Sequence, residues 1–191
     1  MATSAVREAS NRLAFLDRVF VATGLEVEPF DEAQLHRVTY LAIEPYLKRV
    51  PELASQPVVV CEIGGGSTEV LGIQQETIQY SRTYRMGSLR LRRTLEKFNA
   101  PAARFREIME REIDKTAHKI EHEVGAESQV QFVVMGGDVR LLASKLRPDQ
   151  DPESPVRLSL NEIEPFVDEL SKLSVVALSL IHISEPTRQV L

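Results

Sequence analysis

Three consecutive glycines stand between two apolar segments of this chain, and this feature constrains the fold more than any other. The glycines lie in Glu62-Ile-Gly-Gly-Gly-Ser-Thr-Glu69, directly after the apolar run Pro57-Val-Val-Val-Cys-Glu-Ile63. A continuous run of β-branched residues is typical of a buried strand. Because glycine has no Cβ atom, the turn can adopt positive φ angles and bring its main chain close to a ligand. The pattern predicts a strand hairpin whose turn contacts a ligand.

The side chains around this turn indicate phosphate chemistry. Successive N–H groups in a glycine-rich turn can form a concave anion site, and Ser67 and Thr68 add hydroxyl donors. The carboxylates of Glu62 and Glu69 suit Mg²⁺ held between protein and phosphate, and a carboxylate can also orient an attacking water. This combination is typical of metal-assisted phosphoryl transfer. The alternative is a hairpin turn without a ligand, and a Walker A loop is excluded because no Lys follows the glycines.

A second glycine pair repeats the arrangement further along the chain. In Val133-Val-Met-Gly-Gly-Asp-Val-Arg140 an apolar run precedes Gly136 and Gly137, and a helix is expected from about Asp138. A helix N-terminus that glycine leaves accessible is a natural anion site, so both glycines are predicted to bind phosphate. The alternative is a tight turn in which the glycines only permit close packing of helix against strand.

The hydrophobic pattern predicts an α/β fold. Helices are expected at residues 5–22, from Asp31 to about 48, from 87–88 onward, at 101–124, from about 138 and at 161–171. Strands are expected at residues 25–30, 58–63, 67–73, 77–84 and 129–135. Three hairpin-connected strands followed by helices and a further strand form an α/β layer. The order differs from the strict β–α alternation of a dinucleotide-binding fold.

Composition excludes several classes of function. The net charge of -5 argues against nonspecific nucleic-acid binding, which needs a basic face. The single cysteine, Cys61, lies in an apolar run and is interpreted as a buried structural thiol, which fits a reducing compartment. The sequence contains neither an apolar stretch long enough to span a bilayer nor a signal-peptide pattern, so a cytoplasmic protein without a membrane partner is expected.

Two groups of side chains could suggest other sites. His118 and His122 are four residues apart on one expected helix, but no third zinc ligand and no His-Glu-x-x-His pattern accompany them. A solvated helix face is therefore favoured. Arg90, Arg92 and Arg93 could attract a polyanion, but an exposed helix surface is the preferred interpretation.

Several spaced motifs resemble those of the exopolyphosphatase and guanosine-pentaphosphate phosphohydrolase family. Ile63-Gly-Gly-Gly-Ser-Thr-Glu69 is similar to the family's second phosphate motif, and Arg85-Met-Gly-Ser-Leu-Arg90 to the segment after its third hairpin strand. The residues 2–11, 23–28 and 31–35 resemble the end of its first domain, and Gly136-Gly-Asp-Val-Arg140 stands where the family has a Gly-Gly-Thr-like turn. The resemblance covers about residues 1–176 in the same order.

The resemblance implies a fold and an activity. The fold is ribonuclease-H-like, of the actin and sugar-kinase superfamily, with a mixed sheet and an active site between two domains. The activity is Mg²⁺-dependent removal of terminal phosphate from inorganic polyphosphate or guanosine pentaphosphate. Homodimers are common among relatives, so the parent protein is expected to form one.

The resemblance also implies roles for individual residues. Glu32 matches the acid that activates the attacking water, and Arg7 matches a phosphate-binding arginine. Glu69 matches a catalytic or metal-binding carboxylate, and residues Gly64, Gly65, Gly66, Ser67 and Thr68 match the turn that holds phosphate. Without the family context, Arg7 could be a solvated charge, and Glu32 could only complement the macrodipole of its helix.

The chain departs from the family in three ways. Glu62 stands where the family has Asp, so its side chain is one methylene longer and its metal geometry differs. The opening hairpin with its Asp-x-Gly-Ser-Asn-Ser phosphate motif is missing. Residues 178–191 resemble the translation of a sequencing-library adapter and are predicted to be non-native.

These departures predict an incomplete two-domain fragment. Residues 1–50 would be the C-terminal remnant of domain I, and residues 57–176 a partial domain II. A piece that cannot bury both faces of a sheet is marginally stable, so the fragment is expected to be marginally stable and inactive. Two rival functions remain open: an ATP-using phosphotransferase of the same superfamily, and a non-catalytic module that senses guanosine alarmones.

Overall fold

The computed structural model describes residues 4–97, 102–124, 130–151 and 154–172. The chain divides into two compact units, residues 1–139 and 140–191. The first unit holds α1 (Ser4–Arg7), α2 (Arg12–Thr23), α3 (Glu32–Arg49), α4 (Pro51–Ser55), β1 (Val58–Ile63), β2 (Thr68–Gln74), β3 (Thr77–Tyr84), α5 (Ser88–Lys97), α6 (Ala102–Val124) and β4 (Gln131–Met135). Helix α7 (Gly137–Leu146) begins there and continues into the second unit, which also holds α8 (Leu160–Ser171).

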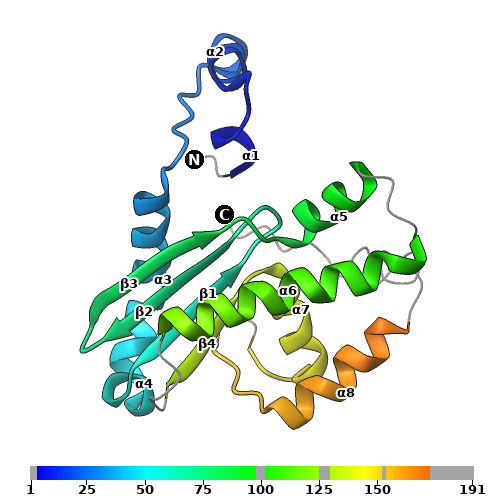
Figure 1. The fold of residues 1–191 in the computed structure, drawn as a ribbon. Coiled ribbons are helices and arrows are strands. Elements are labelled where there is room, and N and C mark those ends of the chain that lie inside the picture. The colour runs from blue at the N-terminus through cyan, green and yellow to red at the C-terminus, as the bar shows by residue number, and fades with distance from the viewer. Residues whose placement is uncertain (1–3, 98–101, 125–129, 152–153, 173–191) are drawn as a thin grey trace. The chain divides into compact units, whose positions relative to one another are not determined.

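The first unit is built on a mixed sheet of four strands in the order β3-β2-β1-β4 (Figure 1). Strands β1, β2 and β3 form an antiparallel meander, and β4 pairs with β1 in parallel. The predicted hairpin strands and the later parallel strand are therefore all present. The predicted α/β fold with a mixed sheet is confirmed.

Helix α3 covers one face of the sheet. It begins at Asp31, whose carboxylate accepts a hydrogen bond from the Gln34 amide at 2.7 Å, while the Gln34 side chain accepts one from the Asp31 amide at 2.9 Å. This reciprocal capping box satisfies two amide groups that a helix start leaves without partners. The apolar residues at the C-terminal half of α3, Ile43 and Leu47, then pack on Val58, Val60, Leu71 and Ile73.

Helix α6 covers the opposite face. Val59, Val70 and Tyr84 are buried there, and Ile120 and Val124 of α6 pack against them. The hydroxyls of Tyr80 and Tyr84 both donate hydrogen bonds to the Glu123 carboxylate of α6. These polar contacts fix the end of α6 against β3.

Cys61 lies in the same layer and is half-buried, whereas the sequence analysis expected a buried thiol. Burial raises the pKa of this thiol to about 11, so the side chain is a poor nucleophile.

Two predictions in the N-terminal part are wrong. The helix expected at residues 5–22 is interrupted at residues 8–11, where the chain turns and restarts at Arg12. The strand expected at residues 25–30 is irregular except for one bridge residue, Pro29. Alternation of apolar and polar residues indicates a strand only where a partner strand supplies hydrogen bonds, and proline has no amide hydrogen to donate.

Helix α2 buries none of its residues, although its sequence is rich in apolar side chains. Leu13 is 74% exposed, Phe20 56% and Val21 78%. Helix α2 therefore carries large apolar side chains that the described residues do not cover.

The second unit contains α8, which begins with a capping box between Ser159 and Glu162. Arg147 forms an ion pair with Glu162. The pKa of Glu162 is lowered to about 2 by the hydrogen bond from Arg147 and by those from Ser159. The predicted non-native tail, residues 178–191, lies outside the described residues, and the predicted domain boundaries stay a prediction. Among the residues that are described, none of the helices is both long and apolar enough to cross a bilayer.

Candidate functional site

The glycine turn connects β1 to β2 as predicted, and the phosphate-binding role of its glycines stays a prediction. The Gly64 amide donates a hydrogen bond to the Ser67 carbonyl at 2.9 Å, which closes the turn. Among the described glycines, only Gly24 and Gly136 have positive φ, so the predicted positive φ of residues 64–66 is wrong. At all three positions, neighbouring atoms leave little room for a Cβ atom.

Neighbouring side chains come very close to the turn. A Cβ atom added to Gly65 would lie 2.9 Å from Leu89 Cδ1, and one added to Gly66 would lie 2.4 Å from Ser4 Oγ. Both separations are shorter than ordinary contacts, so any larger residue would displace these neighbours. Among the described residues, no backbone carbonyl accepts a hydrogen bond from the Gly65 or Gly66 amide. Both amides are therefore able to donate to an anion.

Glu62 and Glu69 are direct cross-strand neighbours in the β1–β2 ladder. Glu69 is only 3% exposed, and its Oε1 accepts a hydrogen bond from Ser67 Oγ at 2.7 Å. Burial raises the pKa of Glu69, the nearby charge of Glu62 raises it further, and the charge of Arg7 opposes the increase. Two adjacent acids, one of them buried, create a strongly negative position at the start of β2.

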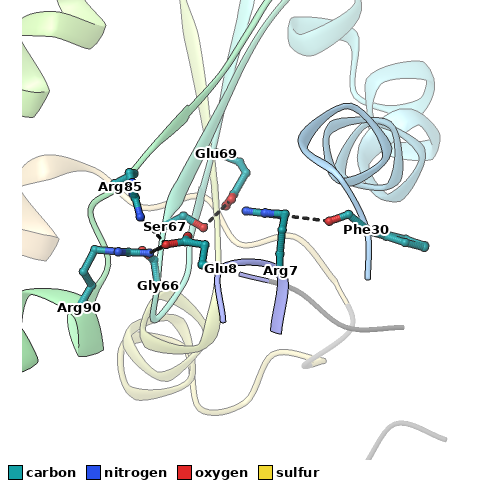
Figure 2. A network of polar contacts seen from close by, with 8 residues as sticks. All are labelled: Arg7, Glu8, Phe30, Gly66, Ser67, Glu69, Arg85 and Arg90. Atoms are coloured by element: carbon teal, nitrogen blue, oxygen red, sulfur yellow. Dashed lines mark hydrogen bonds and ion pairs between the residues drawn. The ribbon is translucent and has the colours of Figure 1, made fainter. Parts of the chain in front are cut away.

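Arg7 brings positive charge to this position. Figure 2 shows its guanidinium beside the Glu69 carboxylate, and its NH1 group donates a hydrogen bond to the Phe30 carbonyl at 3.2 Å. Burial raises the pKa of Glu69 and lowers that of His36, and the charge of Arg7 opposes the first change and adds to the second. The structure therefore brings together Arg7, Glu69 and the glycine turn, which sequence analysis assigned to one site.

Thr39 and His36 belong to this region, but sequence analysis did not assign them to it. Thr39 Oγ1 of α3 donates a hydrogen bond to Glu62 Oε2 at 2.6 Å. His36 Nε2 lies 3.0 Å from the hydroxyl of Thr83, the residue that pairs with Glu69 across β2 and β3. Both α3 side chains are buried. The sequence does contain a signal for them, because His36 and Thr39 lie on the same face of α3 as the core residues Ile43 and Leu47.

Glu32 lies in the first turn of α3 and is exposed. Burial lowers the pKa of His36, and the negative charge of Glu32 partly offsets that decrease. His36 is therefore electrostatically coupled to both Glu32 and Arg7, which places these two predicted site residues near the same end of α3.

The second glycine pair lies beside the first turn. Strands β1 and β4 run parallel with Glu62 opposite Met135, so the residues after both strands meet at one edge of the sheet. Gly136 has a φ of +131°, and a Cβ atom there would lie 2.2 Å from the Ile63 carbonyl oxygen. Gly137 has no such neighbour within 4 Å. Gly136 thus permits close packing, and the phosphate-binding role of both glycines stays a prediction.

Arg90 departs from the expected exposed helix surface. Its side chain is 29% exposed, and it donates hydrogen bonds to Glu8 and to the Gly66 carbonyl. Arg92 and Arg93 are exposed, as expected. His118 and His122 are exposed as well, which confirms the solvated face of α6.

The acids present fit a Mg²⁺ ion that is shared with phosphate. The described residues contain no group of three or more acids, histidines or cysteines able to hold a metal. Mg²⁺ at phosphoryl-transfer sites, however, needs only one or two carboxylates because phosphate and water complete its shell. Glu62 and Glu69 form such a pair. Burial raises the pKa of Glu69 and repulsion from Glu62 adds to that increase, and a divalent cation would relieve this repulsion.

Solved structures of other proteins share this fold. An Aquifex aeolicus PPX-GPPA enzyme is 26% identical with a TM-score of 0.63, and the match covers 93% of this chain and 57% of that one. An exopolyphosphatase from Cytophaga hutchinsonii is 21% identical with a TM-score of 0.69, covering 88% of this chain and 55% of that one. An exopolyphosphatase-like protein reaches a TM-score of 0.70 at 19% identity, covering 93% and 56%.

The chain thus spans little more than half the length of these solved relatives. A search of curated proteins found no match. The family model described as the Ppx/GppA phosphatase family, in contrast, matches residues 1–189. On that match the chain belongs to the Ppx/GppA phosphatase family.

Proposed function

We propose that this chain is part of a phosphoanhydride hydrolase whose parent protein removes terminal phosphate from a polyphosphate substrate. Membership of the Ppx/GppA phosphatase family supports this assignment, and one solved relative is described as an exopolyphosphatase. The observation that carries the proposal is geometric. Arg7, the buried Glu69 and the glycine turn lie together where the parallel strands β1 and β4 end.

Each residue has a proposed task in the reaction. Water attacks the terminal phosphorus, a new P–O bond forms, and the anhydride P–O bond to the rest of the substrate breaks. The exposed carboxylate of Glu32 takes the proton from that water. Arg7 neutralises charge on the phosphoryl oxygens, and the amides of Gly65 and Gly66 donate hydrogen bonds to them. The hydroxyl protons of Ser67 and Thr68, which sequence analysis assigned to phosphate, are donated instead to Glu69 and to the Met86 carbonyl.

The proposed Mg²⁺ site is formed by two neighbouring carboxylates. Glu62 and Glu69 would hold Mg²⁺, which when bound neutralises negative charge on the phosphates. Before the ion arrives, Glu69 is kept in place by Ser67 and Glu62 by Thr39. These hydroxyl contacts keep the two side chains oriented, so the metal position is organised in advance.

The finer assignments are proposals as well. Guanosine pentaphosphate is the second candidate substrate, because it also ends in a phosphoanhydride-linked phosphate. The parent is proposed to be cytoplasmic and to form a homodimer. The isolated chain is proposed to bind substrate without turning it over, since it spans 57% of the length of a solved relative.

Binding of tripolyphosphate to the purified chain tests the proposal. Isothermal titration calorimetry in Mg²⁺ should give saturable binding, and removal of Mg²⁺ with EDTA should weaken it. Arg7→Ala should lower the affinity about tenfold, because a charge-assisted contact to phosphate contributes about 1.5–3 kcal/mol. Arg111→Ala is the matched control, since Arg111 is exposed on α6 and pairs only locally with Glu107. Equal affinities for both variants would contradict the site.

Turnover by the parent protein tests the role of Glu32. Glu32→Gln should reduce phosphate release from polyphosphate by about 100-fold or more while leaving substrate affinity unchanged, because general-base catalysis contributes roughly that much. Tight binding of guanosine pentaphosphate without turnover by the unmodified parent would instead support the alarmone-sensing alternative. Adenosine-dependent binding would support a phosphotransferase.

A further inference from the structure

Glu8, the residue after Arg7, forms ion pairs with two arginines. Glu8 accepts hydrogen bonds from Arg85 NH2 at 2.5 Å and from Arg90 NH2 at 2.7 and 2.9 Å (Figure 2). Hydrogen bonds between guanidinium and carboxylate are the strong kind in proteins. This carboxylate therefore joins the N-terminal segment to the end of β3 and to α5.

Arg90 is itself fixed to the glycine turn. Its Nε donates a hydrogen bond to the Gly66 carbonyl at 2.5 Å, and its backbone amide donates one to the Gly65 carbonyl at 2.9 Å. A single side chain thus separates Glu8 from the turn. Any movement of Glu8 relative to the turn would break at least one charge-assisted contact.

The segment that carries Arg7 has little else to hold it. Helix α1 is four residues long and buries none of them, and a helix this short is not stable without tertiary contacts. Arg7 bonds only to the Phe30 carbonyl, at 3.2 Å, among the hydrogen bonds of its described side chain. The Glu8 contacts are the shorter and more highly charged connection between this segment and the site.

We propose that Glu8 is a positioning residue, whose ion pairs with Arg85 and Arg90 seat the neighbouring Arg7 beside Glu69 for an anionic phosphate ligand. This inference rests on the proposed function, because it assigns Glu8 an effect on that same site. Glu8 acts through Arg7 and does not touch the ligand. The hydrogen bond from Arg90 lowers the pKa of Glu8, which is consistent with a carboxylate that stays ionised in this role.

A competing interpretation predicts the opposite change in ligand affinity when Glu8 is neutralised. Arg85 and Arg90 could themselves receive phosphate, and Glu8 would then occupy their binding position as a competing anion. Neutralising Glu8 would release both arginines and tighten binding. If Glu8 positions Arg7, neutralising it weakens binding.

A double-mutant cycle measured by calorimetry with Mg²⁺ and tripolyphosphate separates these outcomes. Glu8→Gln should weaken binding about tenfold, within the range of coupling that residues of one network show. In an Arg7→Ala background the same change should have no further effect, since Glu8 acts through Arg7. Affinity that rises in Glu8→Gln, or losses that simply add in the double variant, would overturn the proposal.

Two further variants guard against a loss of fold. Arg85 is 72% exposed, so Arg85→Gln removes one of the two arginine partners of Glu8 with little risk to folding, and we expect roughly a threefold loss of affinity. Glu107→Gln is the control. It breaks the ion pair between Glu107 and Arg111 within α6 and should leave the affinity unchanged. Circular dichroism of every variant should match that of the wild type.

A ligand-free measurement keeps the inference distinct from the proposed function. The Arg7 Nε–H resonance in a ¹⁵N correlation spectrum, assigned with Arg7→Lys, reports whether the guanidinium is held. Glu8→Gln should shift and narrow that resonance, whereas Glu107→Gln should not. If tripolyphosphate fails to bind the wild type, the proposed function fails, and an unchanged Arg7 resonance in Glu8→Gln would refute the positioning role separately.

Discussion

At the residue scale, Gly136, which follows β4, and Gly137, which begins α7, should respond in opposite ways to substitution by alanine. Gly136 has positive φ and no room for a Cβ atom, whereas Gly137 has open space around it. Gly136→Ala should therefore lower the free energy of unfolding by about 3 kcal/mol, from backbone strain and overpacking combined. Gly137→Ala should raise it by about 0.5–1 kcal/mol, because alanine favours a helix. Urea unfolding of both variants measures the difference, and similar values would contradict the geometry.

Glu69 predicts a pH dependence that runs opposite to that of most acids. Burial raises the pKa of this carboxyl in the folded state above its ordinary value of 4.5. Protonated Glu69 is thus favoured by folding, and its contribution to stability is lost as the pH rises through the raised pKa. Compared with Glu69→Gln, the wild type should lose stability as the pH rises above the ordinary carboxyl pKa of 4.5. Thermal melts of both proteins at a series of pH values measure this loss of stability. Parallel curves of melting temperature against pH would contradict a buried carboxyl with a raised pKa.

At the residue level, the sequence placed the polar residues of the turn together but did not predict their backbone conformation. The acids, hydroxyls and glycines of residues 62–69 could be assigned to one turn because they are contiguous in the sequence. The φ angles of that turn could not be predicted, because close neighbours such as Leu89 and Ser4 come from distant parts of the chain. The Glu8 contacts with Arg85 and Arg90 were missed for the same reason.

At the scale of elements, α3 presents one face that changes from polar to apolar along its length. Its first buried residues, His36 and Thr39, bond to the sheet, and its later ones, Ile43 and Leu47, pack in the core. Helix α3 therefore anchors itself through its C-terminal half and orients site residues through its N-terminal half.

Thr39→Val tests the polar half of this helix. The change removes the donor to Glu62 and should lower the free energy of unfolding by about 2 kcal/mol, because a charged acceptor loses its partner. In a Glu62→Gln background the cost should fall to about 1 kcal/mol, since the remaining hydrogen bond would be neutral. Chemical denaturation of the four proteins measures the coupling, and equal costs in both backgrounds would exclude this contact.

Most elements could be predicted from the sequence because their patterns are local. The strands of the hairpin and the long helix α6 lie within a residue or two of the expected bounds. The short helix α4 was not predicted. The break at residues 8–11 and the irregular residues 25–28 depend on tertiary contacts, which periodicity does not encode.

At the scale of the whole molecule, ligand binding and stability should be linked. A ligand that binds only the folded state stabilises it by about 2.7 kcal/mol at roughly 100 times its Kd. Mg²⁺ with tripolyphosphate should therefore raise the melting temperature of the chain. The increase should disappear in the double variant Glu62→Gln, Glu69→Gln, and persist in Glu107→Gln. A shift that survives loss of both acids would place the metal elsewhere.

The family could be predicted from the sequence because several spaced motifs keep one order along the chain, and the family match over residues 1–189 confirms it. The division into units at residues 139 and 140 was not anticipated, because it falls inside α7. Helical periodicity is continuous there, and only the distribution of contacts marks the boundary.

The parallel pairing of β1 with β4 has a consequence for biosynthesis. The first glycine turn is made early, in a local hairpin, but the second reaches its side only after β2, β3, α5 and α6 have emerged from the ribosome. Closing so long a loop is entropically slow compared with forming the hairpin. A nascent chain halted before β4 would consequently carry only one of the two glycine turns of the proposed phosphate site. If that site is correct, the chain should gain affinity for phosphate only once this sheet is complete.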